Sequence, residues 1–424
     1  MKALIVAIHF PPVIGGSATV MESLCRELGT DAVVLTPSYS YVTGNPLEGW
    51  AQLDRTQPFP VERVKLLRPL RKPPPKALWL GSAWRRIFED LPLERSVLRQ
   101  AVQVIERHRP DIVFLNEMYA LQWLGSALRR RHSIPVAQFV HGEEITVREL
   151  ASIRYRRAIR RAIQEYDAFV AVSRFTRGEL LRLGASAEKV HLLQNGVDPV
   201  RFQPGPKPLN LLERYGVKGR KVLMTIARLE ERKGHELVIQ AMPQILAEAP
   251  DAVYLIVGSG DLEPRLRRLV EELRLSAHVI FAGAVSPEEL VDHYRLCDVF
   301  VMPNRVLPSG DVEGFGVVFL EAGACGKAVI GGNSGGVPDA VDHEETGLLV
   351  SGESVDELAR AVLRLLQNPE LAARMGAAGR RKAERSSWRQ KAVEFRRIAE
   401  SIIARTRLGD GCESVENQPA RKVR

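Results

Sequence analysis

A chain of 424 residues with a formal net charge of +9 is long enough for two domains of about 200 residues each. Its hydrophobic content of 45% and charged content of 26% are typical of a soluble globular protein. The apolar run at the N-terminus ends at His9 without a small-residue cleavage site, and no stretch reaches the roughly 18 apolar residues of a membrane span. The cysteines lie far apart without a CxxC pair, which argues against a zinc site or a disulfide framework. They fit a reducing cytosol, so we expect a cytoplasmic protein. The cysteines are Cys25, Cys297, Cys325 and Cys412.

Buried apolar runs alternate with helical patterns along the first half of the chain. The runs predict parallel strands, because strands covered on both faces are apolar throughout. The predicted strands are Ala3–Ile8, Ala32–Leu35, Ile112–Leu115, Val136–Val140 and Ala168–Val172. Helices are predicted between them, for example at Thr19–Leu28 and Leu98–His108.

The second half repeats this alternation. Its predicted strands are Val222–Ile226, Val253–Val257, Val279–Phe281, Val299–Met302 and Ala328–Ile330. Its predicted helices are His235–Glu248, Glu263–Leu273 and Glu288–Arg295, followed by Leu371–Glu384 and Trp388–Ala404. The polar tail that begins at Thr406 is expected to be disordered.

This order predicts an α/β chain of two Rossmann-like domains, each a doubly wound parallel sheet. The segment Asn195–Pro208 is rich in proline and glycine and marks the linker. We therefore place one domain at residues 1–198, completed by the helix at 388–404, a second at 199–387, and a disordered tail at 406–424. Ligands of open parallel sheets bind at the carboxyl ends of the strands, so the site is expected in the cleft between the domains.

The basic excess belongs to the first half, where residues 1–198 contain 28 Lys and Arg against 20 Asp and Glu. Arginines crowd the segment Arg154–Arg161, and the stretch Arg63–Lys76 is basic and rich in proline. Two interpretations stay open: a solvated helix face with a loop, or a surface that meets anionic lipid or an anionic acceptor. The second implies a peripheral position on the inner face of the membrane. No nucleic-acid-binding motif accompanies the charge, so we expect no nucleic-acid partner.

The strongest motif is Gly310–Ala322, GDVEGFGVVFLEA, a glycine-rich loop that leads into a helix. Backbone N–H groups of Gly314, Phe315 and Gly316 at a helix N-terminus suit a diphosphate. Glu321 lies within the apolar part of that helix, where a buried carboxylate is costly without hydrogen-bond donors. Sugar hydroxyls would supply them, and the alternative is a structural Glu321 paired with a buried arginine or with backbone.

Glu313 and Glu321 form an E-x7-E pair, followed by CGKAVIGGNSGGVPDAV at residues 325–341. Together these resemble the retaining glycosyltransferases of family 4, which have the GT-B fold, and the wording is most similar to the bacterial phosphatidylinositol-mannoside mannosyltransferase group. Further segments fall in the order of that family: PVIGG at 12–16, HG at 141–142, NGVD at 195–198, ARLEERKG at 227–234 and VGSG at 257–260. The resemblance covers nearly all of residues 1–404.

Two cations near a strand end, Arg228 and Lys233, fit a phosphate-binding role. A departing diphosphate gathers negative charge, and fixed cations stabilise it in place of a metal. The neighbouring Arg232 has the alternative of a surface charge on the turn. No Asp-x-Asp dyad is predicted to face the cleft, so we expect no metal and no cofactor other than the nucleotide-sugar donor.

The resemblance assigns the remaining site residues. It places the acceptor in the first domain and the donor in the second. It implies that the loop of Gly15 and Gly16 closes over the donor, that Gly258 lies in a donor-binding loop, and that the base lies against backbone near Gly283, Ala284 and Val285. It also implies that Glu321 binds ribose hydroxyls and that Glu313 reaches the donor sugar.

His141 is either a structural histidine at a strand end or, by the resemblance, a site residue near the reacting sugar. Glu143 and Glu144 follow it directly, and we expect one of them to orient His141 or to meet the acceptor.

The expected activity is transfer of a hexose, with retained configuration, to a lipid, polyol or glycan acceptor. The donor expected first is GDP-mannose, and the second candidate is a UDP-hexose. No carboxylate is clearly placed as a nucleophile, so a front-face route is expected, in which the leaving phosphate takes the acceptor proton. The alternatives are a nucleotide-sugar epimerase, a phosphorylase and an inactive donor-binding protein. A nicotinamide oxidoreductase is disfavoured, because Glu263 stands where a dinucleotide motif has its third glycine.

Overall fold

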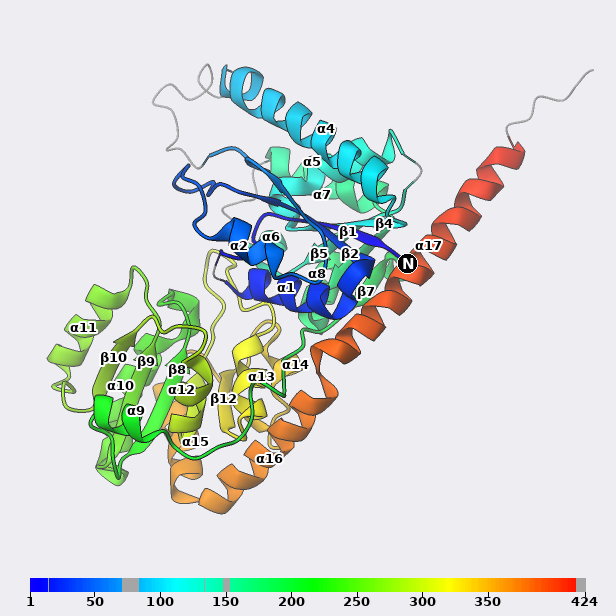
Figure 1. Cartoon of the computed structure of the whole chain (residues 1–424). Helices are drawn as coiled ribbons and strands as arrows, with labels where there is room; N and C mark the ends of the chain where they lie inside the picture. The colour runs from blue at the N-terminus through cyan, green and yellow to red at the C-terminus, as the bar shows by residue number, and fades with distance from the viewer. Residues whose placement is uncertain (14, 71–83, 133, 148–152, 417–424) are drawn as a thin grey trace, which may run out of the picture.

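The computed structural model describes residues 1–13, 15–70, 84–132, 134–147 and 153–416 (Figure 1). Two parallel sheets, each covered by helices, form two domains joined in the middle of the chain, and a long C-terminal helix returns to the first domain. The predicted fold class, two doubly wound Rossmann-like domains, is confirmed.

The first sheet has the strand order β3-β2-β1-β4-β5-β6-β7, with every pairing parallel. Its centre is apolar because each strand is covered on both faces; in the register, Leu4 of β1 lies between Val33 of β2 and Val113 of β4. The strands are β1 (Ala3–Ala7), β2 (Ala32–Pro37), β3 (Val61–Val64), β4 (Ile112–Asn116), β5 (Val136–Val140), β6 (Ala168–Ala171) and β7 (Val190–Leu192).

Helices cover both faces of this sheet. One face carries α4, α5, α7 and α8, and the other carries α1. The helices are α1 (Gly16–Leu28), α2 (Trp50–Arg55), α4 (Leu91–His108), α5 (Met118–Arg129), α6 (Glu143–Thr146), α7 (Ile153–Glu165) and α8 (Arg174–Arg182), with shorter turns η1 (Gly29–Asp31), η2 (Arg86–Asp90) and η4 (Ala187–Lys189).

The second sheet has the order β10-β9-β8-β11-β12-β13, again parallel throughout. Its strands are β8 (Lys221–Ile226), β9 (Ala252–Val257), β10 (Val279–Gly283), β11 (Val299–Met302), β12 (Ala328–Gly332) and β13 (Gly347–Val350). Its helices are α9 (Leu209–Arg214), η5 (Glu231–Lys233), α10 (His235–Glu248), α11 (Glu263–Glu272), α12 (Leu290–Leu296), α13 (Val317–Ala324), α14 (Val337–Ala340), α15 (Val355–Gln367) and α16 (Pro369–Arg385).

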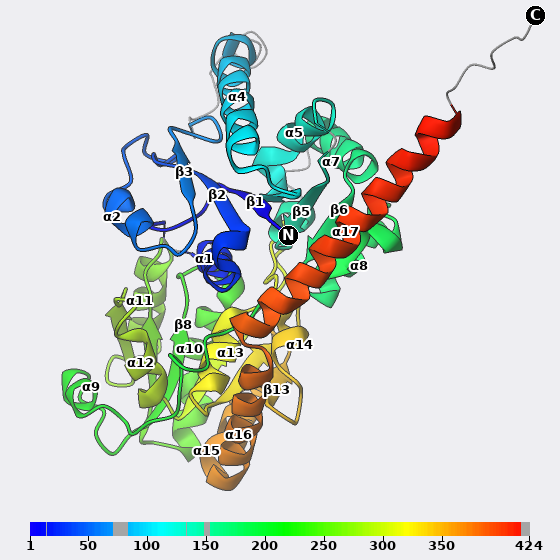
Figure 2. The ribbon, with the colours of Figure 1, turned by 45° about the vertical axis from the view of Figure 1, so that its right-hand side comes forward.

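The chain crosses between the domains twice, and the two crossings lie side by side. The Val197 N–H donates to the Ser386 carbonyl at 3.0 Å, and the Trp388 N–H donates to the Val197 carbonyl at 3.2 Å. After the second crossing, α17 (Trp388–Glu416) lies along the first domain next to α1 (Figure 2). Its Phe395 is fully buried against Phe114 and Phe139 of the first sheet.

The C-terminal end differs from the expectation of a disordered tail from residue 406. The helix α17 continues to Glu416, so residues 406–416 are helical, and residues 417–424 lie outside the described residues. No described helix combines the length and the apolar character that crossing a bilayer requires.

Three strands, β3, β7 and β13, were not predicted. All three lie at an outer edge of a sheet, where a strand has one neighbour and is short. β3 has the sequence VERV and is mostly half-buried, so it lacks the continuous apolar run of a central strand.

Candidate active site

The carboxyl-end loops of the two sheets touch across the domain boundary. A Cβ atom built on Gly314, in the loop before α13, would lie 1.8 Å from the carbonyl oxygen of His141, which follows β5. A Cβ atom built on Gly336 would lie 2.9 Å from the Cβ atom of Ser173, which follows β6. Ligands of open parallel sheets bind at this end of the strands, so the polar residues here form the candidate active site.

Glu313 is the centre of a buried charge cluster in the second domain. Its Oε2 atom accepts hydrogen bonds from Arg232 Nη1 at 2.8 Å and from Asn304 Nδ2 at 3.2 Å, and it also accepts one from Lys233 Nζ. Burial alone would raise the pKa of Glu313, but the charges of Lys233 and Arg232 outweigh it and hold that pKa at about 2. The carboxylate is therefore ionised at neutral pH and fixes two cations in place.

Arg232 is not the surface charge that the sequence left open as its alternative. Its side chain is 7% exposed, and besides Glu313 it contacts Glu230 Oε2 at 3.0 Å and Asp311 Oδ1 at 3.3 Å. Burial opposes the charge of this guanidinium, but the three carboxylates around it raise its pKa. The turn η5 directs Arg232 and Lys233 together onto Glu313, a pairing that no motif predicts.

Arg228 lies outside this cluster. Its guanidinium is 67% exposed and pairs with Glu230 Oε1 at 2.7 Å, so Glu230 links Arg228 to Arg232. Lys233 is 13% exposed, and burial lowers its pKa although Glu313 opposes that shift. Arg228 and Lys233 thus differ, since Lys233 is held inside the domain on Glu313 and Arg228 is exposed at the surface beside Glu230.

Glu321 projects from α13 to a buried tyrosine. Its Oε2 atom accepts a hydrogen bond from the Tyr294 hydroxyl at 2.6 Å, and Tyr294 is fully buried. Burial raises the pKa of Glu321, and this hydrogen bond opposes the rise. The described residues form no other hydrogen bond to this carboxylate, so its second oxygen remains able to accept from a ligand hydroxyl.

His141 is held from two sides in the first domain. Its Nε2 atom lies 2.6 Å from Oδ1 of Asn116, the last residue of β4, and its backbone N–H donates to Glu144 Oε1 at 2.8 Å. Because an amide oxygen only accepts, Nε2 carries the hydrogen and Nδ1 is left as an acceptor. Burial lowers the pKa of His141, with the Glu117 and Glu143 carboxylates opposing, which favours the neutral imidazole.

Asn116 is a residue that the sequence analysis missed, since it ends an apolar strand without any motif. Glu144, which we expected either to orient His141 or to meet the acceptor, does contact the backbone of His141. It is 7% exposed, and burial raises its pKa to about 7. The ring of His141 is therefore oriented by Asn116, and its backbone by Glu144.

The predicted glycines divide into two groups by what surrounds them. A Cβ atom built on Gly15 or Gly16, at the start of α1, would meet nothing within 4 Å, and the same holds for Gly283 at the end of β10. By contrast, a Cβ atom on Gly258 would lie 1.9 Å from the Ala227 carbonyl oxygen, so that glycine is required by loop packing. The first group borders open space, where a ligand has room to approach the backbone.

The other predicted donor-loop positions lie around the start of α13. Gly316 caps the helix with a φ of 89°, a conformation that favours glycine. Phe315 is 3% exposed and packs in the core of the second domain, so only its backbone is available to a ligand. Val285, after β10, is partly buried against the same core.

Asp339 of α14 joins the two domains beside this region. Its Oδ2 atom accepts from the Arg174 backbone N–H at 2.7 Å, and its Oδ1 atom accepts from Gln194 Nε2 at 2.6 Å and contacts Arg174 Nε at 2.8 Å. Both partners belong to the first domain, whereas Asp339 is 6% exposed in the second. The contact holds the carboxyl ends of the two sheets together.

Within the described ranges, no group of three or more His, Cys, Asp or Glu side chains is arranged to hold a metal ion. The polar groups of the candidate site instead comprise two buried cations on Glu313, a half-buried carboxylate on α13, and a neutral imidazole across the domain boundary.

Two family models match the chain in succession. The model described as Glycosyltransferase Family 4 matches residues 14–201, and the model described as Glycosyl transferases group 1 matches residues 212–382. The two matches together extend over both domains.

Named relatives share extensive sequence with the chain. It is 37% identical over 316 residues to the GDP-mannose-dependent alpha-(1-6)-phosphatidylinositol monomannoside mannosyltransferase of Mycolicibacterium smegmatis, covering 74% of this chain and 81% of that one. It is 31% identical over 392 residues to the GDP-mannose-dependent monoacylated alpha-(1-6)-phosphatidylinositol monomannoside mannosyltransferase of Corynebacterium glutamicum, covering 91% and 94%.

The fold also matches a solved structure. The Anabaena protein HepE in complex with UDP superposes with a TM-score of 0.75 at 21% sequence identity, over 95% of this chain and 100% of that one. This likeness concerns the arrangement of the two domains.

Proposed function

The chain belongs to glycosyltransferase family 4 and is a glycosyltransferase that uses a nucleotide sugar, and from this premise we propose that it transfers mannose from GDP-mannose to a phosphatidylinositol-type lipid acceptor. The names of the two relatives support this donor and this acceptor class. The observation that carries the proposal is the pairing of Lys233 and Arg232 with Glu313 next to the start of α13, opposite His141 of the first domain.

In the proposed reaction the donor diphosphate lies at the start of α13. Backbone N–H groups at Gly314, Phe315 and Gly316 face the phosphates there, where the helix N-terminus favours negative charge. Lys233 stabilises the charge that gathers on the leaving diphosphate, and the exposed Arg228 turns from Glu230 toward it. Arg232 keeps Glu313 ionised and in place.

Two carboxylates bind the rest of the donor in this proposal. Glu321 uses Oε2 for Tyr294 and accepts from ribose hydroxyls with its other oxygen. Glu313 reaches a hydroxyl of the sugar from its position between Lys233 and Asn304. The base rests against the backbone of Gly283 to Val285, where Gly283 leaves open space.

We propose retention by a front-face route without a metal. The neutral His141, whose Nε2 hydrogen is used by Asn116, presents its ring and its carbonyl near the sugar rather than acting as an acid. The leaving phosphate oxygen takes the proton of the acceptor hydroxyl as the new glycosidic bond forms on the same face. Lys233 and Arg228 supply the positive charge that a divalent ion provides in metal-dependent enzymes.

A lipid acceptor requires the enzyme to meet a membrane surface, and we propose that the first domain does so. It carries the basic excess, and its Trp84 and Phe88 are 57% and 61% exposed with ring centroids 5.3 Å apart. Basic residues near an anionic surface contribute about 1 kcal/mol each. Co-sedimentation with anionic vesicles should fall at high salt. An absence of binding at low salt would refute the membrane contact and show that these residues form an ordinary solvated surface.

The test of the function is a transfer assay with purified protein. GDP-mannose, UDP-glucose and ADP-glucose are each offered with vesicles that contain phosphatidylinositol mannosides, in EDTA and in magnesium. The expected product is an α-mannosyl lipid formed from GDP-mannose at equal rates in both buffers, with its anomeric configuration determined by NMR. Transfer only from a UDP-sugar would refute the proposed donor. An inverted product would refute the retaining mechanism, and activity only in the presence of a metal would refute the metal independence.

A further inference from the structure

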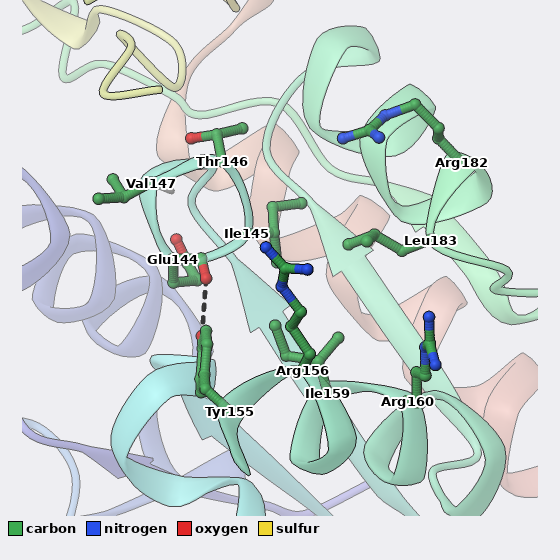
Figure 3. A pocket seen from close by; sticks show the side chains of 10 residues that line it. All are labelled: Glu144, Ile145, Thr146, Val147, Tyr155, Arg156, Ile159, Arg160, Arg182 and Leu183. Carbon is green, nitrogen blue, oxygen red and sulfur yellow. Dashed lines mark hydrogen bonds between the residues drawn. The ribbon is translucent and has the colours of Figure 1, made fainter. Parts of the chain in front are cut away.

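A cavity lies in the first domain, away from the donor residues. It has a volume of about 650 Å³ and lies between α6, α7 and the end of α8 (Figure 3). Its size falls in the range of roughly 300–1,000 Å³ that is common for small-molecule sites. Neither Lys233 nor Glu313 lines it, so the donor cluster does not account for it.

The lining combines positive charge with aliphatic surface. Arg156 and Arg160 lie one turn apart on α7, and Arg182 lies at the end of α8 on the other side of the cavity (Figure 3). Ile145 and Leu183 line it with aliphatic side chains. This combination of guanidinium and hydrocarbon fits an anionic group attached to an apolar or ring-shaped body.

Arg156 and Arg160 are exposed and form no ion pair with any described carboxylate, whereas Arg182 pairs with Glu179. Like charges four residues apart on a helix repel each other. A phosphate between them removes that repulsion and accepts hydrogen bonds from both guanidinium groups, an interaction that is strong and often bidentate.

The cavity is connected to the candidate active site through Glu144. This residue lines the cavity, and its Oε1 atom accepts the backbone N–H of His141. The Tyr155 hydroxyl donates to the Glu144 carbonyl at 2.6 Å and so fixes α7 against α6. A ligand in the cavity therefore lies beside the residue that holds the backbone of His141.

We propose that this cavity binds a phosphate ester of the acceptor, with Arg156 and Arg160 contacting the phosphate and Ile145 and Leu183 contacting the body of the molecule. That the ligand is the acceptor rests on the proposed function, whereas the binding of a phosphate ester does not. The same chemistry is present in a lipid headgroup and in a free sugar or polyol phosphate.

The test measures binding directly with two probes. The soluble probe is inositol 1-phosphate, followed by titration calorimetry with inositol as its phosphate-free partner. The lipid probe is a vesicle of phosphatidylinositol in phosphatidylcholine, followed by co-sedimentation with pure phosphatidylcholine as reference. The variant carries Arg156→Gln and Arg160→Gln, and the matched control carries Arg157→Gln, an exposed arginine of the same helix that does not line the cavity.

The double variant should bind the phosphorylated probe at least about tenfold more weakly, because one charge-assisted hydrogen bond is of that order. With inositol 1-phosphate the control should stay within about twofold of the unchanged protein. With vesicles it should lose no more than about fivefold, the effect of one basic residue near an anionic surface. The thermal shift caused by GDP should be equal in all three proteins, which shows that they are folded. Preference for the soluble or the vesicle probe identifies the source of the phosphate, and either supports the proposal.

Three results would overturn the proposal that this cavity binds a phosphate ester. They are no binding of either probe, equal affinity of the double variant and the unchanged protein, or a loss of affinity in Arg157→Gln as large as that in the double variant. Binding that depends on Arg156 and Arg160, without any mannosyl transfer from GDP-mannose, would support the phosphate site and refute the proposed function. Mannosyl transfer by the unchanged protein, together with unchanged probe binding by the double variant, would support the proposed function and refute the phosphate site.

Discussion

Replacement of Lys233 by methionine tests the role of the buried cations in catalysis. The substitution keeps most of the side-chain length and removes the charge, while Glu313 retains Arg232 and Asn304 as donors. If Lys233 stabilises the departing diphosphate, its interaction is strongest in the transition state. We expect kcat to fall by about 10²–10³-fold, the range for loss of one such donor, and the donor KM to change by less than about tenfold.

The structure also sets the expected loss of stability. The pKa of Glu313 falls from 4.5 to about 2, which corresponds to roughly 3 kcal/mol of favourable interaction shared between Lys233 and Arg232. A depressed carboxyl pKa stabilises the fold above the unfolded value and stops doing so as the pH falls through the folded value. Burial lowers the pKa of Lys233, so methionine also removes a cost and offsets part of this loss. Lys233→Met should therefore unfold with about 1 kcal/mol less free energy at pH 7, and the difference should shrink as the pH falls from 4.5 toward 2.

The assay combines urea unfolding with steady-state kinetics over a range of GDP-mannose concentrations. Lys382→Met is the matched control, because Lys382 is 16% exposed against 13% for Lys233, lies in the same domain and donates to Asp342 at 2.9 Å. The control should lose stability and keep its kcat. A Lys233→Met enzyme with kcat within about threefold of normal, or a control that loses as much kcat, would refute the reasoning.

Three further substitutions separate the roles of other site residues. Glu321→Ala should raise the donor KM severalfold with little change in kcat, because ribose contacts exist equally in the ground and transition states, and an unchanged donor titration would contradict this. Asp339→Ala removes the acceptor for Arg174 across the domain boundary; it should lower the free energy of unfolding by roughly 2–3 kcal/mol and enlarge the protein in X-ray scattering, and an unchanged scattering profile would count against the contact in solution. Burial raises the pKa of Glu144 to about 7. Between about pH 4.5 and 7 this carboxyl therefore ionises in the unfolded state while the folded state keeps it protonated, so the unchanged protein should lose up to roughly 3 kcal/mol of stability over this range. Glu144→Gln keeps the acceptor for the His141 N–H and should show a flatter profile in urea unfolding at pH 5 and pH 8; equal slopes would contradict the assignment.

The central strands and longer helices could be predicted because their pattern is local. Val136–Val140 and His235–Glu248 match β5 and α10 residue for residue, since a strand covered on both faces is apolar and an amphipathic helix has a clear period. The edge strands β3 (VERV) and β7 (VHL) lack a continuous apolar run, and β13 (GLLV) has only a short one. They exist because a neighbouring strand offers hydrogen bonds, which a local pattern does not reveal.

The candidate site also contains residues that local motifs predict and residues that they do not. The sequence indicated Glu313, Lys233 and His141 through motifs, but it gave no sign of Asn116, which lies 25 positions before His141 at the end of another strand. The contact between Arg232 and Glu313 spans 81 positions. Such partners follow from the order of strands in a sheet, which brings the ends of nonconsecutive elements together.

The glycine loop before α13 illustrates how one motif has two physical causes. The sequence alone explained Gly314 by the approach of a phosphate to the backbone. The structure adds a second requirement, because any Cβ atom at this position would lie 1.8 Å from the His141 carbonyl oxygen, and one on Gly336 would lie 2.9 Å from the Cβ atom of Ser173, which also belongs to the first domain. The two glycines thus allow the domains to approach until Asp339 reaches Arg174. In the proposed reaction this approach brings His141 of the acceptor domain to the donor loop, so the same backbone that binds the diphosphate also sets the distance between the two substrates.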